Sequence, residues 1–361
     1  MISVLNWVVI DICVYILMVL PLLFSIKYIN GQYYIKAVGN GCIYKTYIFF
    51  LLFFCLFDKT SGDYFHYQEI VENIYSSRDY STHLEFIYVW IIRLVGGNYF
   101  LFRLLIWGTA ILLYYKMIDR LKLDKLLSIW SFIIISLVNF SYPRVSLGLI
   151  ILFLGCTYLL NKSILNKILG ILLVVFSIFF HKTIYLILPI LILSFFSLKK
   201  WMIICLIILL PVMSFILNHL ILLLIPYMSV TEFNYLNIEK ESLGIAAIIN
   251  KVLFYIPLSY ILIDSVKSIY KIESRECLYF LRLSIYILLF SILLFALPFG
   301  SNYIFERIGL MALIPISIVF AYKLQYEKKS FMTILVLILL IMSNFYNLFY
   351  MYYLKKIGLG I

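Results

Sequence analysis

Two cationic positions bracket a pair of apolar segments in the middle of the sequence. Arg144 precedes the apolar run 145–160, and His181 with Lys182 follows the next apolar run, 164–180. A membrane core about 30 Å thick needs about 20 helical residues per crossing, so the chain crosses and returns, and both cationic positions reach one membrane surface. A guanidinium and an imidazole there can bind an anion. The alternative is that Arg144 extends to lipid headgroups and His181 caps a helix.

A second polar group precedes these runs, in the segment SGDYFHYQEIVENIY and the nearby HLEF. Its carboxylic acids, imidazole and phenol can hydrogen-bond sugar hydroxyls, and a carboxylate can act as a general base. We take two acids as candidate catalytic residues, Asp63 and Glu85, and three residues as candidate substrate-binding residues, His66, Tyr67 and Glu69. The alternative is a solvated loop whose acids cap short helices, since Asp63 precedes a helical pattern.

A third polar group lies late in the chain, in ALPFGSNYIFERIGL. Arg307 in this segment can bind a diphosphate through two parallel hydrogen bonds, and Glu306 can orient it. The alternative is an arginine at the membrane surface paired with its neighbour. The sequence has no glycine-rich phosphate loop and no metal-binding or serine-hydrolase motif. We therefore expect neither a cofactor nor a metal, and no nucleotide site.

Composition places the chain among integral membrane proteins. Its 361 residues are 65% apolar and only 13% charged, with mean hydropathy +1.07, whereas an average soluble domain is about 25% charged. The net charge of +12 comes from Lys and Arg scattered between apolar runs, which argues against nucleic acid as a partner. The six Cys are isolated and predict packing positions, neither zinc ligands nor a disulfide frame.

Apolar runs predict an all-α bundle of about twelve membrane spans in one domain, 1–361. The outer loops then comprise about 58–98 and 226–243. The predicted spans are 3–26, 44–57, 99–117, 126–142, 145–160, 164–180, 183–198, 201–225, 244–263, 278–297, 308–322 and 331–350.

Basic residues give the orientation of these spans. More than half of the 29 Lys and Arg residues fall in the short segments after odd-numbered spans, and short basic loops stay in the cytoplasm. The polar groups described above then face the outside, as do Lys355 and Lys356, which the rule disfavours. Within the first outer loop, EFIYVWIIRLVGG has helical spacing but is too short to span, so we expect a helix at the membrane interface.

The order of these segments resembles the EpsG family of exopolysaccharide proteins, which overlaps the Wzy-type polymerases. GDYFHYQEI followed by EFIYVWIIRLVGGNYFLF is similar to the family's N-terminal signature. SYPRVSLGL resembles its arginine-containing outer turn, and HKT resembles its turn built on His and Ser or Thr. The resemblance covers roughly residues 1–350. One departure is Val145, where the family commonly has Gln after the arginine.

The resemblance implies a multi-pass protein of the bacterial cytoplasmic (inner) membrane. It implies a polymerase that joins undecaprenyl-diphosphate-linked oligosaccharide units at the outer face, into O antigen, capsule or exopolysaccharide. The reaction needs cations at headgroup level because its leaving group is a lipid diphosphate. Arg144, Lys182 and Arg307 fit that need, His181 can be donor or base, and Asp63 or Glu85 can bind or deprotonate the acceptor sugar.

Two other functional classes remain open at this point. A different membrane glycosyltransferase that uses lipid-linked sugars would also carry acids in its first outer loop. A polysaccharide flippase or transporter would also have about twelve spans, but its cations would lie deep in a central cavity. Membrane lipid is a partner in every case, and whether a separate chain-length regulator binds is open.

Overall fold

The fold is built almost entirely of helices that run roughly side by side. In a computed structural model of the chain, the residues described are 4–29, 32–35, 41–57, 63–77, 85–136, 142–196, 245–267, 274–295, 308–326 and 331–356, with six single positions between 201 and 216. The helices before the central turn are α1 (Val4–Ser25), α2 (Gly41–Phe57), α3 (Asp63–Ser77), α4 (Phe86–Leu94), α5 (Tyr99–Arg120), α6 (Lys125–Ser136), α7 (Pro143–Leu159) and α8 (Ile164–Ile178).

A short turn of 3-10 helix follows, η2 (Lys182–Ile187), and it leads into the second part of the chain. The remaining helices are α9 (Leu188–Leu193), α12 (Ile245–Lys267), α13 (Arg275–Phe295), α15 (Leu313–Tyr326) and α16 (Phe331–Lys356). Two strands, β1 (Ile26–Ile29) and β2 (Gln32–Ile35), pair antiparallel with Ile26 opposite Ile35. This hairpin departs from the all-helical prediction, which treated the same residues as a plain loop.

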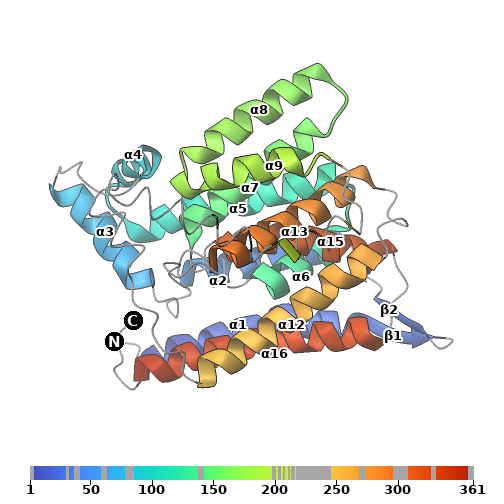
Figure 1. Cartoon of the computed structure of the whole chain (residues 1–361). Helices are drawn as coiled ribbons and strands as arrows, with labels where there is room; N and C mark the ends of the chain where they lie inside the picture. Colours follow the sequence, from blue (N-terminus) through green and yellow to red (C-terminus); the bar gives the residue numbers. More distant parts are fainter. Residues whose placement is uncertain are drawn as a thin grey trace.

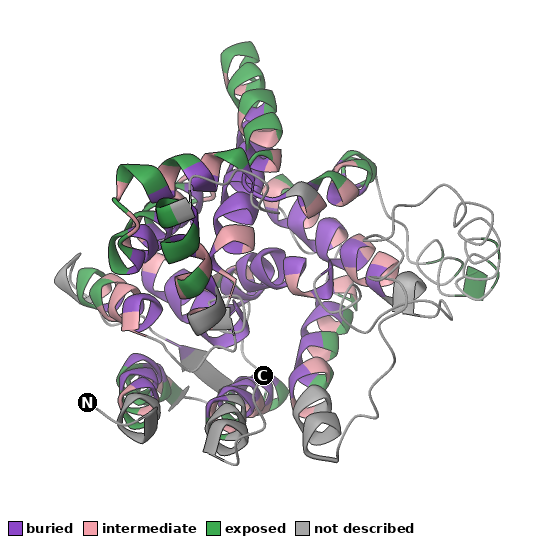
Figure 2. Cartoon of the chain, turned by 90° about the vertical axis from the view of Figure 1, so that its left-hand side faces the viewer, coloured by how far each residue is buried: buried purple, intermediate pink, exposed green. Residues whose placement is uncertain are grey.

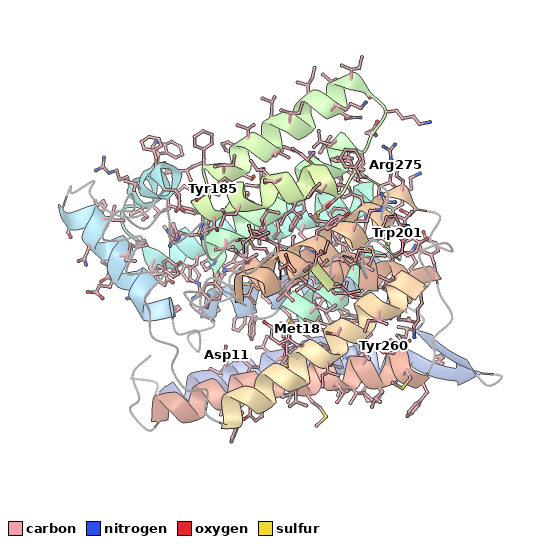
Figure 3. All side chains as sticks on the ribbon, viewed as in Figure 1. Asp11, Met18, Tyr185, Trp201, Tyr260 and Arg275 are labelled. Carbon is pink, nitrogen blue, oxygen red and sulfur yellow. The ribbon has the colours of Figure 1, made fainter. Side chains whose placement is uncertain are left out.

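The long helices alternate in direction, so their termini gather at two ends of the molecule (Figure 1). We call one the Glu85 end, after Glu85; it carries α3, α4 and the start of α7. We call the other the Lys125 end, after Lys125; there the backbone N–H of Asp124 donates to Gln325 Oε1 at 2.7 Å, joining α15 to the loop before α6. Figure 3 places Tyr185 of η2 near the Glu85 end and Arg275 at the Lys125 end. Among the described residues, Lys122, Lys125 and Arg275 lie at the Lys125 end; which side of a membrane this end faces stays a prediction.

Most predicted spans coincide with helices, and the predicted span 183–198 corresponds to a shorter helical stretch. It consists of η2 followed directly by the six-residue α9, which ends at Leu193. His181 caps its start, and Pro189 lies in the first turn of α9, where Pro is tolerated. Most of the predicted span 201–225 and the outer loop 226–243 lie outside the described residues. A bundle of twelve spans is therefore not confirmed.

Two described helices are long and apolar enough to cross a membrane by length and composition. They are α5 and the helix Ile308–Tyr326, which extends α15 backwards. The second is mostly buried inside the bundle, whereas α8 exposes most of its residues (Figure 2). The exposed face of α8 is apolar, with Leu165, Leu172 and Phe176 among its residues. A helix with such a face needs an apolar surrounding, as a bilayer provides.

Close backbone contact fixes α8 against α7. A Cβ on Gly155 would lie 3.0 Å from the carbonyl oxygen of Gly170, and a Cβ on Gly170 would lie 2.9 Å from that of Gly155. Small residues allow this approach between helices in lipid. Elsewhere Asn344 of α16 donates to the Tyr15 hydroxyl at 3.0 Å and to the Ile134 carbonyl at 2.7 Å, which joins α16 to α1 and α6.

Candidate functional site

Glu85 occupies the N-cap position of α4 but does not cap that helix with its side chain. Its backbone is extended there, and the helix starts when the Tyr88 N–H bonds to the Glu85 carbonyl at 3.0 Å. The carboxylate points elsewhere and is only 8% exposed. An acid at this position normally satisfies the first N–H groups of its helix. The Glu85 carboxylate does not do so, which indicates that other contacts of the site determine its position.

Arg144 is the main partner of Glu85. Arg144 Nη1 donates to Glu85 Oε2 at 3.1 Å, and the two side chains are 16% and 8% exposed. Pro143 begins α7 and so places Arg144 in its first turn, where Pro is favoured. The positive end of the helix and the guanidinium together favour an anion at this point.

Tyr67 of α3 covers another edge of the same guanidinium. Its hydroxyl oxygen accepts from Arg144 Nε at 3.2 Å and from Nη2 at 3.0 Å. Its ring centre lies 4.8 Å from the guanidinium carbon, within cation–π range. Arg144 therefore meets an acid from before α4 and a phenol from α3, two elements that are separate in the sequence.

His181 approaches the second oxygen of Glu85. His181 Nδ1 lies 3.6 Å from Glu85 Oε1, and the two side chains are 10% and 8% exposed. The same nitrogen accepts from the backbone N–H of Thr183 at 3.4 Å, so His181 is also the N-cap of η2. Glu85 thus bridges the arginine and the histidine, one carboxylate oxygen facing each.

Tyr88 and Gly148 hold these three groups together from behind. The Tyr88 hydroxyl donates to the Arg144 carbonyl at 2.9 Å, and the Tyr88 ring packs 5.8 Å from that of Phe180, just before His181. Burial raises the pKa of the Tyr88 phenol well above its usual value, while the Arg144 charge opposes this, so Tyr88 stays a donor. A Cβ on Gly148 would lie 2.6 Å from Ile184 of η2, so the glycine lets η2 approach α7.

A second arginine anchors α3 beside the site. Arg103 of α5 is 2% exposed and donates to the Cys55 carbonyl. Its guanidinium carbon lies 4.8 Å from the Tyr64 ring and 5.9 Å from the Tyr99 ring. At the other end of α3, a Cβ on Gly97 would lie 2.7 Å from Tyr75. The helix that carries Tyr67 is therefore held at both ends.

The structure brings together four of the predicted site residues: Glu85, Arg144, His181 and Tyr67. Glu69 lies on α3 but is exposed. Asp63 begins α3, one helical turn before Tyr67, but its side chain and those of His66 and Lys182 are not described. Glu306 and Arg307 lie outside the described residues, so their expected roles in binding the diphosphate stay predictions.

Sequence reasoning missed Tyr88 and Arg103. Tyr88 is three residues after Glu85 and so shares its helical face, a spacing that points to the same site. Arg103 is a lone charge in the apolar run FLFRLLIW, and an ionisable residue inside a span deserves a functional hypothesis by default. Among the described residues, no group of three or more His, Cys, Asp or Glu could hold a metal ion.

A bundle of apolar helices with a buried acid, arginine and histidine at one end defines a helical membrane protein with a polar site at its surface. The chain belongs to the EpsG family, whose model matches residues 42–359. This is a family of membrane proteins of polysaccharide biosynthesis, of the Wzy polymerase type. Neither the curated proteins nor the solved structures yielded a match to the chain.

Proposed function

We propose that the protein is a polysaccharide polymerase that joins lipid-diphosphate-linked oligosaccharide units, with the cluster of Glu85, Arg144, His181 and Tyr67 as its active site. The observation that carries the proposal is the Glu85 bridge, in which one carboxylate faces both a guanidinium and an imidazole. The bridge places an anion-binding group, the Arg144 guanidinium, near a proton-accepting group, the His181 imidazole, in one buried cluster. Membership of the EpsG family agrees with it.

The reaction joins an acceptor sugar hydroxyl to the anomeric carbon of a donor sugar. The hydroxyl oxygen forms the new C–O bond, the bond from the anomeric carbon to the diphosphate oxygen breaks, and its electron pair leaves with the lipid diphosphate. The acceptor proton passes to a base. No metal or nucleotide is needed to balance this step, because the donor is already activated by its diphosphate.

Arg144 is the residue that stabilises the leaving diphosphate. Its planar guanidinium can form two parallel hydrogen bonds to phosphate oxygens. A well-placed donor to a developing anion contributes about 3 kcal/mol to transition-state stabilisation. Arg307 and Lys182 are proposed to complete the cationic surface. Arg307 immediately precedes the helix Ile308–Tyr326. The last turn of this helix, which carries Gln325, lies at the Lys125 end, so its first residue, Ile308, lies toward the Glu85 end.

His181 is the proposed base, and Glu85 is the residue that positions it. One Glu85 oxygen accepts from Arg144 and the other lies 3.6 Å from His181 Nδ1, so Glu85 suits orientation better than direct proton abstraction. An imidazolium formed on His181 would gain an ion pair with this carboxylate. Asp63, which shares a face of α3 with Tyr67, is proposed to bind the acceptor sugar together with His66 and Glu69.

The glycan profile of a strain that lacks the gene tests this function. A polymerase predicts single repeat units transferred to the final acceptor, with no long chains, and restoration by the wild-type gene but not by Arg144→Lys. Loss of all surface glycan with lipid-linked units retained on the cytoplasmic side would instead indicate a flippase. Absence of the complete lipid-linked unit would indicate a glycosyltransferase that acts earlier.

A further inference from the structure

Helix α3 contacts the bundle through two tyrosines that each lie on an arginine. Tyr64 and Tyr67 are three residues apart and so share one helical face. The Tyr64 ring centre lies 4.8 Å from the Arg103 guanidinium carbon, and the Tyr67 ring centre lies 4.8 Å from that of Arg144. The same contact therefore occurs twice along α3, one turn apart.

The two arginines differ in what else can reach them. Arg103 is 2% exposed, bonds to the Cys55 carbonyl and has a second ring, Tyr99, beside it. Arg144 has a 16% exposed side chain and lies at the candidate site. A ligand from outside can therefore reach Arg144 but not Arg103, which makes the Tyr64 contact the permanent one.

The Tyr67 hydroxyl occupies one bidentate edge of Arg144. The Nε and Nη2 atoms of an arginine point two parallel N–H groups in one direction, the arrangement that binds two phosphate oxygens. Here both N–H groups converge on the single phenol oxygen of Tyr67, at 3.2 and 3.0 Å. Because charged acceptors form stronger hydrogen bonds than neutral ones, a phosphate can replace the phenol at this edge.

We propose that Tyr67 is a displaceable cover of the phosphate-binding edge of Arg144. A diphosphate takes the Nε and Nη2 edge, the Tyr67 hydroxyl leaves, and α3 opens at that turn while Tyr64 stays on Arg103. The inference deepens the proposed function, because it takes the diphosphate of a lipid-linked sugar as the natural ligand. A phospholipid headgroup has the same phosphate chemistry, so the test includes it.

Binding of inorganic pyrophosphate to the full-length protein in phosphatidylcholine nanodiscs tests the displacement. Tyr67→Phe keeps the ring over Arg144 but removes the competing oxygen. We expect it to bind pyrophosphate about tenfold more tightly than the wild type, since the lost bond is one to a charged group. Equal or weaker binding by Tyr67→Phe would overturn the inference. Tyr75→Phe, the same change at an exposed position of α3, should leave the affinity unchanged.

Arg144→Ala separates this inference from the proposed function. If Arg144→Ala abolishes binding while Tyr67→Phe does not strengthen it, the anion site stands and the cover is wrong. If neither wild type nor Tyr67→Phe binds pyrophosphate, both proposals fail. Phosphatidylglycerol added to the nanodiscs should leave the pyrophosphate affinity unchanged. A large loss of that affinity would identify a lipid headgroup as the ligand.

Amide hydrogen exchange of the wild-type protein tests the opening without any variant. Exchange in the peptide covering 63–77 should rise when pyrophosphate is added, because α3 loses its Tyr67 contact. Exchange in α5 around Arg103 should stay constant, since the Tyr64 contact persists. Protection of 63–77 that is unchanged or increased by pyrophosphate would contradict the opening.

Discussion

Arg144 at the Glu85 end and Lys125 at the Lys125 end have partners of the same kind but in different surroundings. Lys125 lies 3.4 Å from Asp119, donates to the Tyr115 hydroxyl and has the Tyr44 ring 5.6 Å away. Arg144 has an acid, a phenol oxygen and two rings around it in the same way. Each cation therefore has one carboxylate and one tyrosine hydroxyl as partners.

The two clusters differ in burial and in origin. Lys125 and Asp119 are 35% and 65% exposed and belong to helices joined by a short loop. Arg144 and Glu85 are 16% and 8% exposed and lie 59 residues apart in the chain. An exposed pair contributes about 0 to 1 kcal/mol, and desolvating a buried pair can cost as much as the pair gains. The contacts of Lys125 thus follow from the short loop between α5 and α6. The contacts of Arg144 carry a desolvation cost that the rest of the fold must offset, as is common at functional sites.

Replacing Arg144 by lysine and Lys125 by arginine should give the largest difference between the two ends, measured as the rate of polymer synthesis. Arg144→Lys keeps the charge but loses the planar fork, so we expect polymer synthesis to fall about a thousandfold, the effect of losing a donor to the transition state. Lys125→Arg should keep synthesis within about twofold, as at an exposed pair. Initial rates with purified protein and lipid-linked repeat units measure both. Wild-type activity of Arg144→Lys would mean that Arg144 only contacts lipid headgroups.

The histidine prediction separates capping from chemistry. His181→Asn supplies a good N-cap for η2 but has no titrating ring, so we expect a loss of about a hundredfold in rate, the lower range for a general base. Protein abundance and thermal stability should stay near wild type. Retained activity in His181→Asn would mean that His181 only starts the turn.

Removing Glu85 at one end and Asp119 at the other compares how much each ion pair contributes to the free energy of unfolding. Glu85→Ala leaves Arg144 buried without its carboxylate, so we expect a loss of about 3 kcal/mol in unfolding free energy. Asp119→Ala, in the exposed pair, should cost less than about 1 kcal/mol. Reversible unfolding in detergent measures both variants. Equal costs would remove the physical distinction between the two ends.

The smallest effect concerns the helices that carry the site. Gly170→Ala places a methyl group within 3 Å of α7, so we expect a loss of about 2 kcal/mol from overpacking. Gly108→Ala has no neighbour within 4 Å of the new methyl and should be neutral or stabilising by about 0.5 to 1 kcal/mol. The same unfolding assay serves both, and a destabilised Gly108→Ala would indicate a contact of α5 not accounted for.

Local patterns were sufficient to predict most helices and the meeting of Arg144 with His181. The helix predicted in EFIYVWIIRLVGG is α4. It ends at Leu94 and is followed by Gly96 and Gly97, both with positive φ, as glycines after a helix often have. The placement of Arg144 and His181 at one end of the bundle, where each faces Glu85, follows from two helical runs of similar length. Such inferences need only helical period and membrane thickness.

Contacts between distant segments were beyond these patterns. Nothing local shows that one oxygen of Glu85 faces Arg144 and the other His181, or that Tyr67 rather than Glu69 reaches Arg144, because both depend on how α3 and α4 pack. The helical stretch within 183–198 ends earlier than predicted, at Leu193, because apolar composition alone does not show where a helix ends. The hairpin 26–35 is a short local pairing between helices that carries no periodic signal long enough to recognise.

The central claim is that a lipid diphosphate binds at the Glu85 end and not at the Lys125 end. An experimental structure of the protein in nanodiscs with a lipid-linked diphosphonate tests this directly, because its non-cleavable headgroup stays bound. We predict phosphorus within about 4 Å of the Arg144 guanidinium nitrogens, the geometry of a charge-assisted hydrogen bond, with the sugar toward His181. Diphosphonate bound among the lysines of the Lys125 end, with the Glu85 end empty, would contradict the account.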